Sequence, residues 1–460
     1  MSEAKSYFFS GIGGSGMMPL AMIVRAQGAS VAGSDRMLDQ GRLGTKFAFL
    51  QSLGIGLFPQ DGSGLTSGGQ IFVATAAIED HVPDMVKAKA LGLHRMRRAD
   101  LLAELFNAAP IGIAVGGTSG KSTVTGMIGW MLHATGRDPT VMNGAVMKNF
   151  VSADVPFATS LVGRGDIFVS EVDESDGSIV LYRPKVAVLN NITLDHKSLD
   201  ELRQLFRDFA LKSDAVVLNL DDDEARRLAA ALPAGKLRTY SFQDERADLF
   251  GANIAEAPFA ISFEANGVPV SLQVPGRHNA ENALAALAAC EAAGVPLAQA
   301  AEALAGFKGL RRRFELIGEA NGVTVIDDFG HNPDKIAATL RTLHTQPGRL
   351  LLFFQPHGYG PLRQMGRELT DMFAAEMAAD DVLIMPDPVY YGGTTDKSVG
   401  TAEFIAGVVA RGRHAEHVAD RAACGERLAA LARPGDRIVV MGARDDTLTL
   451  FAEDILARLG

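Results

Sequence analysis

Cysteine and long apolar runs are both scarce in this sequence. Its 460 residues include two cysteines, Cys290 and Cys424, which lie far apart in alanine-rich stretches. A disulfide framework or a cysteine-ligated metal is therefore not expected, and both side chains are expected to be buried as small hydrophobes. No apolar run reaches the roughly 18 residues of a membrane span, and the N-terminus lacks a signal-peptide pattern. These absences favour a cytoplasmic protein that has no membrane partner.

Positive charge is also in short supply. The 44 lysines and arginines are outnumbered by 54 acidic residues, which gives a formal net charge of -10. Because a phosphate backbone is bound by a basic surplus, nucleic acid is not expected as a partner. Hydrophobic residues make up 47% of the chain and charged residues 21%, which excludes a disordered protein. At roughly 100 to 200 residues per domain, the length predicts about three domains.

The order of hydrophobic patterns predicts an α/β protein. Short β-branched or aromatic runs alternate with alanine- and leucine-rich stretches along the whole chain. This alternation is typical of parallel sheets that are covered by helices on both faces. A segment at 107–110 ends the first block, and a basic run at 311–313 begins the last. We therefore expect three domains, over residues 1–108, 109–310 and 311–460, the last of them doubly wound.

A glycine-rich loop at residues 11–16 follows a predicted strand and precedes a predicted helix. The backbone N–H groups of such a loop, together with the positive end of the helix dipole, can bind a pyrophosphate. Asp35 follows the last glycine by 19 residues, close to the spacing of an acid that binds a ribose hydroxyl. The pattern fits a dinucleotide or a nucleotide sugar equally well, and a purely structural turn is the alternative.

A second glycine-rich loop occupies residues 117–122, between a predicted strand at 111–115 and a predicted helix. In a phosphate loop the backbone N–H groups surround the phosphates, the lysine binds the outer two, and the final hydroxyl binds magnesium. Lys121 and Ser122 occupy those two positions, although Val115 replaces the first glycine of the usual pattern. The alternative is an ordinary glycine turn with a solvated lysine.

Polar segments follow two further predicted strands of the same block. Residues 171–176 are mostly acidic, and residues 195–197 are Asp-His-Lys. Ligands bind at the carboxyl ends of parallel strands, so both segments can lie beside the phosphate loop and a magnesium nucleotide. A solvated loop and an ordinary turn histidine are the alternatives, since magnesium prefers oxygen and a histidine ligand is unusual.

Two polar segments nearer the C-terminus also fit nucleotide binding. Residues 327–333 begin with paired acids at a predicted strand end and finish with a proline suited to a first helical turn. Asp328 there suits a ribose hydroxyl or a cation, although it or Asn332 can instead cap the helix. Asn279 and Asn282 head an alanine-rich helix, where simple capping is again the alternative.

Together these motifs resemble the Mur ligase family, whose members form amide bonds with ATP to build the stem peptide of peptidoglycan. The resemblance covers the whole chain and rests on the order of its motifs, at residues 11–16, 33–35, 97–105, 117–122, 171–176, 191–196, 276–282, 311–313 and 327–333. It implies a Rossmann-like UDP-binding domain, a central P-loop ATPase-type domain, and a C-terminal doubly wound domain that receives the acceptor and closes during the reaction. A nicotinamide oxidoreductase would explain only the first glycine loop.

The resemblance further implies a reaction, two cofactors and a set of residues. The carboxylate of UDP-N-acetylmuramate would be phosphorylated by ATP with Mg2+, and an amine would attack the acyl phosphate. The UDP-sugar would contact Gly11, Gly13, Gly14, Ser15, Gly16, Asp35 and Thr75. ATP would contact Gly117, Thr118, Ser119, Gly120, Lys121, Ser122, Asn279, Asn282 (which would face adenine), Arg313 and Asp328. Magnesium would be bound by Ser122, Glu171 and His196, and the catalytic residues would be Lys121, His196, Arg313, His331 and His357.

The segments expected to bind the acceptor resemble two different branches of the family. Residues 354–357 match the branch of the family that adds L-alanine, but Gly358 stands where that branch usually has an arginine. Phe329 replaces its usual tyrosine, whereas residues 312–325 and 148–150 are more similar to the branch that reattaches a tripeptide. We expect L-alanine or a related amino acid as the acceptor, and a monomer or weak homodimer. A tripeptide ligase and a non-catalytic nucleotide-sugar-binding protein are the alternatives.

Overall fold

The computed structural model describes residues 5–75, 78–193, 198–389, 396, 398–443, 445 and 447–460. The chain divides into two compact units. Unit 1 contains Met1–Asn253, Phe263–Leu272 and Glu281–Gly309, and unit 2 contains Ile254–Ser262, Gln273–Ala280 and Leu310–Gly460. Among the described residues, every helix is too short or too polar to cross a membrane.

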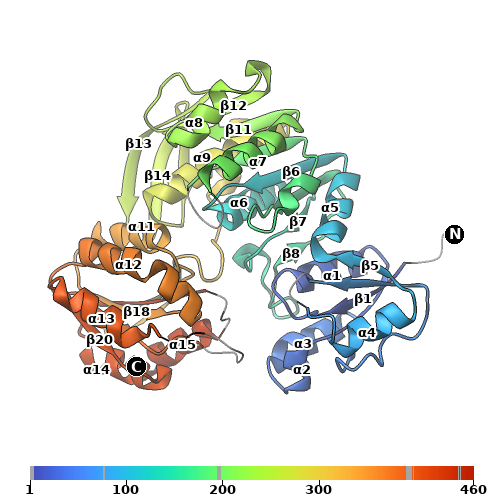
Figure 1. Ribbon diagram of the computed structural model, residues 1–460. Helices are drawn as coiled ribbons and strands as arrows, with labels where there is room; N and C mark the ends of the chain where they lie inside the picture. The colour runs from blue at the N-terminus through green and yellow to red at the C-terminus, as the bar shows by residue number, and fades with distance from the viewer. Residues whose placement is uncertain are drawn as a thin grey trace. The chain divides into compact units, whose positions relative to one another are not determined.

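The first sheet lies in unit 1 and is parallel, with the strand order β3-β2-β1-β4-β5. Its elements, blue in Figure 1, are β1 (Ser6–Ser10), α1 (Met17–Ala26), β2 (Ser30–Ser34), α2 (Arg36–Asp39), α3 (Gly44–Ser52), β3 (Gly56–Phe58), β4 (Gln70–Ala74), α4 (Pro83–Ala90), β5 (His94–Arg97) and α5 (Arg98–Ala108). Successive residues of a strand face opposite sides of a sheet. Tyr7 and Phe9 accordingly pack with α1, α3 and α5, whereas Phe8 packs against Phe72 and α4.

The second sheet has the strand order β15-β14-β13-β12-β11-β10-β6-β9-β7-β8. Its strands are β6 (Ile111–Gly116), β7 (Thr140–Met142), β8 (Ser160–Leu161), β9 (Ile167–Glu171), β10 (Val186–Leu189), β11 (Ala215–Asn219), β12 (Leu237–Ser241), β13 (Leu249–Ala257), β14 (Ala260–Ala265) and β15 (Val268–Leu272). Strands β7, β9, β6, β10, β11 and β12 run parallel. The helices of this region are α6 (Lys121–Ala134), α7 (Leu199–Leu211), α8 (Asp223–Ala230), α9 (Arg277–Ala292) and α10 (Leu297–Leu304).

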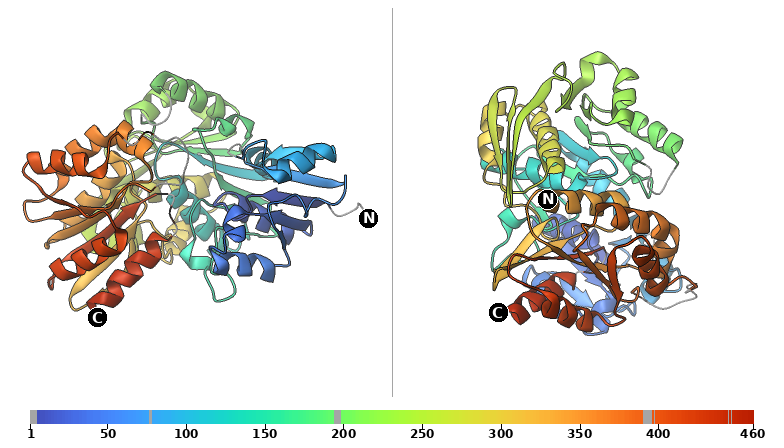
Figure 2. Two further views of the ribbon diagram at one scale, coloured as in Figure 1. Left: turned by 60° about the horizontal axis from the view of Figure 1, so that its bottom comes forward. Right: turned by 90° about the vertical axis from the view of Figure 1, so that its left-hand side faces the viewer.

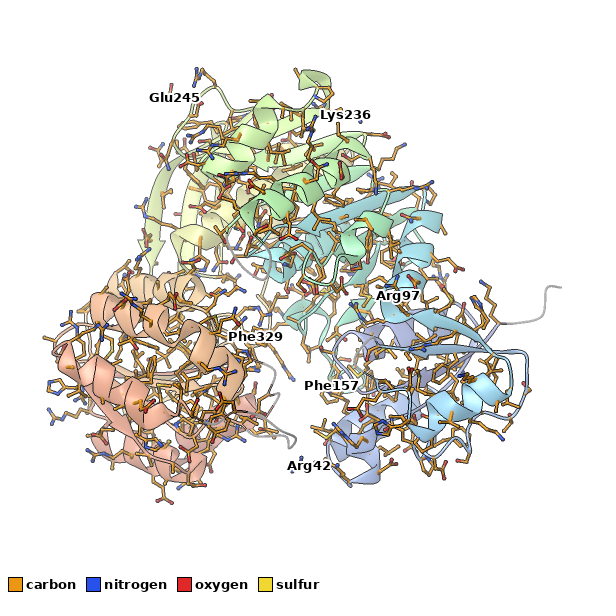
Figure 3. All side chains as sticks on the ribbon, in the orientation of Figure 1. Arg42, Arg97, Phe157, Lys236, Glu245 and Phe329 are labelled. Atoms are coloured by element: carbon orange, nitrogen blue, oxygen red, sulfur yellow. The ribbon has the colours of Figure 1, made fainter. Side chains whose placement is uncertain are left out.

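Aromatic side chains join the first sheet to the second within unit 1. Phe106 of α5 lies against Phe168 of β9 and against Tyr182, with ring centroids 5.7 and 5.1 Å apart. Phe49 of α3 meets Phe157, which Figure 3 labels, at 5.8 Å. These contacts belong to one continuous hydrophobic core. They fix the last turn of α5 against β9 and Tyr182.

Unit 2 is built on a third sheet, with the strand order β16-β17-β21-β18-β19-β20. Its elements are β16 (Glu315–Ala320), β17 (Val323–Asp328), α11 (Pro333–His344), β18 (Leu350–Gln355), α12 (Tyr359–Glu376), β19 (Val382–Met385), α13 (Thr401–Ala410), β20 (His414–His417), α14 (Arg421–Leu431), β21 (Arg437–Gly442) and α15 (Leu448–Leu459). Among the described pairings of this sheet, the β16–β17 pairing is antiparallel and the others are parallel. Helices α11, α12 and α13 cover one face, and α14 and α15 cover the other (Figure 2).

The structure confirms the α/β fold class and the covered parallel sheets that the sequence predicts. Both cysteines are buried and free, as expected. The basic run 311–313 forms the turn before β16. The exact domain boundaries, at 108/109 and 310/311, stay predictions.

Candidate active site

The first glycine loop joins β1 to α1 in unit 1. Gly11 has a φ of +82°, a conformation that glycine adopts without strain, and its N–H donates to the carbonyl of Ser34 at 2.8 Å. Gly16 is the residue before the first turn of α1. Ser10 of β1 pairs with Ala74 of β4, so the loop and Thr75 follow neighbouring strand ends. The predicted UDP-sugar residues of this loop and Thr75 therefore lie on one edge of the sheet.

Asp35 has structural partners that the sequence did not reveal. One carboxylate oxygen accepts the N–H of Gly13 at 2.8 Å, and the other accepts the N–H of Met37 at 2.8 Å. Asp35 thus caps α2 and holds the glycine loop against it. Both carboxylate oxygens thus already accept a hydrogen bond from the backbone. Contact of Asp35 with a ribose hydroxyl stays a prediction.

The second glycine loop joins β6 to α6 and has the shape of a phosphate loop. Gly117 and Gly120 have φ values of +116° and +85°, so both positions favour glycine. A Cβ at Gly120 would collide with the side chains of Asn190 and Asn282. Val115, which replaces the first glycine of the usual pattern, is a buried residue of β6. The departure therefore falls in the strand and leaves the loop itself unchanged.

Two asparagines and a threonine hold the phosphate loop in place. Asn191 accepts the N–H of Ser119 through its side chain at 2.8 Å. Its carbonyl accepts the N–H of Thr118 at 3.1 Å, and the Thr118 hydroxyl donates to the carbonyl of Thr193, also at 3.1 Å. Asn190 donates to the side-chain oxygen of Asn282 at 3.0 Å. Asn282, predicted to face adenine, thus lies against the loop, and that role stays a prediction.

Lys121 is the first residue of α6 and is not a solvated lysine. Its ammonium donates to the carbonyl of Gly117 at 2.7 Å and to the carboxylate of Glu174 at 2.8 and 3.1 Å. One fifth of the Lys121 side chain is exposed, and only 6% of the Glu174 side chain. The phosphates of a nucleotide would bind this same ammonium group. Glu174 therefore competes with a nucleotide for Lys121.

Two of the three predicted magnesium ligands, Ser122 and Glu171, lie side by side. The hydroxyl of Ser122 donates to a carboxylate oxygen of Glu171 at 2.8 Å. Gly144 lies so close to Glu171 that a Cβ there would collide with the carboxylate. Burial alone would raise the pKa of Asp173, but hydrogen bonds from Ser175 and the nearby charge of Lys121 hold it below its usual value. The hydroxyl of Ser122 and the carboxylate of Glu171 offer hard oxygen ligands of the kind that Mg2+ prefers.

A complete metal centre is not present among the described residues. Within them, no group of three or more histidine, cysteine or acidic side chains is placed to hold a metal ion. The predicted ligand His196 lies outside the described residues, as do Asp195 and Lys197. Ser122 and Glu171 supply two ligands, and a magnesium ion bound with a nucleotide usually takes the rest from phosphates and water.

In unit 2, the predicted residues gather at the ends of β17 and β18. Asp328 ends β17 and accepts the N–H groups of Phe314 and Gly330, each at 2.9 Å, and the hydroxyl of Thr339 at 3.0 Å. Asp328 therefore ties together three segments of the unit. The N-cap of α11 is instead Asn332, whose side chain accepts the N–H of Lys335 at 3.0 Å, so the capping alternative holds for Asn332. Contact of Asp328 with a ribose stays a prediction.

An aromatic and histidine cluster follows Asp328. The guanidinium of Arg313 lies 4.1 Å from the ring centre of Phe329, and the Nδ1–H of His331 donates to the carbonyl of Phe329 at 2.9 Å. The rings of His331 and His357 are 5.7 Å apart. Burial, with the nearby charge of Lys335, lowers the pKa of His331 to about 3, so this imidazole is neutral at pH 7. The structure thus brings Arg313, His331 and His357 together.

Asn279 has a local partner. Its side chain is buried and donates to the carbonyl of Pro275 at 2.7 Å, one turn earlier. This bond stabilises the start of α9. Contact of Asn279 with ATP stays a prediction.

Sheets with helices on both faces and a phosphate loop that opens a helix define a multidomain nucleotide-binding α/β protein. Residues 6–109 match the Mur ligase family, catalytic domain; residues 115–290 match the Mur ligase middle domain; residues 312–444 match the Mur ligase, glutamate ligase domain. The chain belongs to the Mur ligase family, as the resemblance of its motifs predicted.

Similar proteins extend along the whole chain. A Streptomyces coelicolor protein named UDP-N-acetylmuramate--L-alanine ligase is 35% identical over 456 residues, which cover 95% of this chain and 95% of the relative. A UDP-N-acetylmuramate-alanine ligase structure from Thermotoga maritima aligns with a TM-score of 0.78 at 24% identity, covering 98% of each chain. A murein peptide ligase structure from Psychrobacter arcticus aligns with a TM-score of 0.70 at 24% identity, covering 99% of each. At these identities the two structures show a shared fold.

Proposed function

We propose that this protein is an ATP-dependent, ADP-forming ligase that joins L-alanine, or a related amino acid, to UDP-N-acetylmuramate in peptidoglycan precursor synthesis. Relatives with that name match the chain over almost its whole length. The observation that carries the proposal to this chain is the preformed group of Lys121, Ser122 and Glu171 at the phosphate loop. A protein that only bound a nucleotide sugar would not need this second, phosphate-binding group of residues.

The chemistry requires activation of a carboxylate, which is a poor electrophile in water. Transfer of the γ-phosphate of ATP to the sugar's carboxylate gives an acyl phosphate, and attack by the acceptor amine then forms the amide and releases phosphate. The loop's N–H groups would position the phosphates, and Lys121 would leave Glu174 to neutralise their charge. Ser122 and Glu171 would hold Mg2+, which when bound neutralises further negative charge on the phosphates.

Unit 2 would supply the acceptor residues. His331 and His357 are proposed to line the acceptor site, and Arg313 and Asp328 to contact ATP, as in the resemblance to the family. A neutral His331 suits this role because it does not repel an incoming ammonium group before that group loses its proton. The sequence position that usually carries an arginine for the acceptor is Gly358, which has no side chain.

A tripeptide acceptor is the second candidate, and Gly358 is the observation that favours it. Arginine binds a free carboxylate through two parallel hydrogen bonds. Without it at 358, the carboxylate of a lone amino acid is held less firmly, whereas a peptide carries its carboxylate farther from the reacting amine. A hollow of about 270 Å³ between α12 and α13 is lined by three arginines and Glu403, and two of the arginines, Arg363 and Arg367, lie on α12. They are candidates for binding that carboxylate.

Phosphate release decides between these acceptors. The protein would be incubated with ATP, Mg2+ and UDP-N-acetylmuramate, and with L-alanine, other amino acids or a tripeptide in turn, and the products would be identified by mass. Release with one acceptor assigns the reaction. No release with any acceptor, despite binding of the UDP-sugar, would leave the non-catalytic alternative. A cytoplasmic location and a monomeric or weakly dimeric state stay predictions.

A further inference from the structure

The last residues of unit 1, before the chain enters the main part of unit 2, are held by the 3-10 helix that contains Asn149. The side-chain amide of Asn149 donates to the carbonyl of Gly306 at 2.7 Å and accepts the N–H of Lys308 at 2.8 Å. The N–H of Lys148 donates to the carbonyl of Gly309 at 3.1 Å. Three hydrogen bonds therefore fasten the stretch from Gly306 to Gly309, the connecting segment.

The indole of Trp130, in α6, packs against the connecting segment. Its Nε1–H donates to the carbonyl of Ala303 at 2.7 Å, and a Cβ at Gly306 would stand 3.0 Å from the ring. Glycine at 306 therefore lets the segment lie directly on the indole. The rings of Trp130 and Phe150 are 6.1 Å apart, centre to centre. The helix that begins with Lys121 at the phosphate loop also supports the connecting segment.

The stretch of chain before Asn149 contacts the phosphate loop. Asn143 is almost fully buried, and its side chain donates to the carbonyl of Ser122 at 2.9 Å. The next residue, Gly144, lies so close to the Glu171 carboxylate that a Cβ there would collide with it. This stretch therefore runs from both of the described candidate magnesium ligands to the connecting segment.

We propose that Asn149 is a positioning residue, which fixes the direction in which the chain leaves unit 1 relative to the phosphate loop. The inference rests on the proposed function, in which unit 2 supplies Arg313 and Asp328 to ATP at that loop. Arg313 follows Gly309 closely in sequence, so freedom at the connecting segment is passed on to it. With the segment fastened, fewer arrangements of unit 2 compete with the one that reacts.

A role in stability alone makes a different prediction. Loss of the two side-chain bonds would then lower the unfolding midpoint and leave the turnover of the folded protein unchanged. Asn266 offers a matched control, because its amide makes the same pair of bonds with the same spacing. It donates to the carbonyl of Asp248 and accepts the N–H of Phe250, both at 2.8 Å. These partners lie at the start of β13, which has no part in the proposed reaction.

The first test measures phosphate release at saturating ATP, UDP-N-acetylmuramate and acceptor in the wild type, Asn149→Ala, Asn149→Asp and Asn266→Ala. Each lost hydrogen bond changes an equilibrium constant about two- to tenfold, so kcat of Asn149→Ala should fall about four- to a hundredfold. Asn149→Asp keeps the acceptor for the Lys308 N–H, so it should fall less, and it covers the case in which the alanine variant fails to fold. Asn266→Ala should turn over as the wild type does. UDP-N-acetylmuramate should bind all four proteins equally in calorimetry.

Trp130 gives a readout that does not depend on turnover, because it is the only tryptophan of the chain. Loosening of the connecting segment uncovers the indole at Gly306. Acrylamide should therefore quench the fluorescence of Asn149→Ala more strongly than that of the wild type. Asn266→Ala should be quenched as the wild type is.

Wild-type kcat or wild-type quenching in Asn149→Ala would overturn the inference, and so would an equal loss of kcat in Asn266→Ala. Weaker binding of UDP-N-acetylmuramate by Asn149→Ala would also overturn it, since Asn149 would then be a substrate contact. Failure of the wild type to release phosphate with any acceptor would refute the proposed function and the inference with it. Release by the wild type with an unchanged kcat in Asn149→Ala would refute the inference alone.

Discussion

Lys121 is predicted to serve both the stability of unit 1 and its chemistry, and the substitution Lys121→Met separates the two. The ammonium is the cation bonded to Glu174, whose side chain is almost completely buried. Methionine keeps much of the volume of lysine but leaves the Glu174 carboxylate without that partner. Phosphate release should fall by more than about a hundredfold, because the charge that neutralises the phosphates is gone.

The stability cost follows from the burial of the pair. Removing one partner of a buried ion pair costs about 3 to 5 kcal/mol, and the exposed fifth of Lys121 places the expected cost near 3 kcal/mol. For a large domain this corresponds to a fall of roughly 5 to 10 °C in the unfolding midpoint. Differential scanning calorimetry of the wild type and the variant, without nucleotide, measures this shift.

The double variant Lys121→Met with Glu174→Gln tests the cause. It removes the uncompensated carboxylate, so most of the lost midpoint should return while phosphate release stays absent. Glu174→Gln alone keeps the bond from Lys121 to Gly117 and should still bind ATP. Wild-type phosphate release in Lys121→Met would refute the phosphate role of the lysine. An equal midpoint in the single and double variants would refute the pairing argument.

Three further predictions concern stability, pH and substrate binding. Asp35→Ala should cost about 1 to 3 kcal/mol of unfolding free energy, since it removes the acceptor of the Gly13 N–H, and should weaken UDP-sugar binding but not ATP binding; equal weakening of both in calorimetry would contradict separate sites. Burial raises the pKa of Asp381, but the bond from His344 and two backbone N–H groups outweigh it and hold the pKa below its usual value. Its stabilisation should therefore be complete above about pH 4 and be lost as the pH falls further, and melting curves of Asp381→Asn should show a lower midpoint at pH 7 with a weaker acid dependence. Gly358→Arg should lower the free energy of unfolding about as much as Gly358→Ala, by about 1 to 3 kcal/mol, because any Cβ strains this backbone; an unchanged free energy of unfolding would show that the loop can relax.

The phosphate loop could be predicted from the sequence because its signals are local. Residues 117–122 contain the glycines, the lysine and the hydroxyl in a fixed spacing, and the apolar run before them predicts β6. The same holds for the first glycine loop. Where spacing along the chain fixes the geometry, prediction and structure agree.

Partners that come from distant segments could not be predicted in this way. Glu174 is 53 residues from Lys121, and Asn190 is 92 residues from Asn282. Their pairing depends on the parallel order of β9, β6 and β10, which brings three strand ends to one edge. The acidic run around Glu174 was a visible signal, but the sequence could not show which of its carboxylates faces the lysine.

Asp35 shows a different limit, in which a local signal was present and a familiar spacing outweighed it. An aspartate directly before a short helical stretch is a common N-cap, and Asp35 accepts the Met37 N–H in that role. The motif spacing instead favoured a ribose contact. Both functions draw on the same two oxygens, so the cap restricts how a ribose hydroxyl can approach.

At Gly358 the backbone conformation has to be known before the effect of the missing arginine side chain can be judged. From sequence, Gly358 is a lost arginine that a substitution could restore. In the structure Gly358 has φ +153° and ψ 163°, a region that side chains rarely adopt, so the backbone at this position disfavours an arginine. An arginine placed at 358 would therefore strain the backbone as well as add a charge. A carboxylate clamp for the acceptor, if α12 supplies it, has to come from residues such as Arg363 or Arg367, and Arg363 must first give up its ion pair with Asp396.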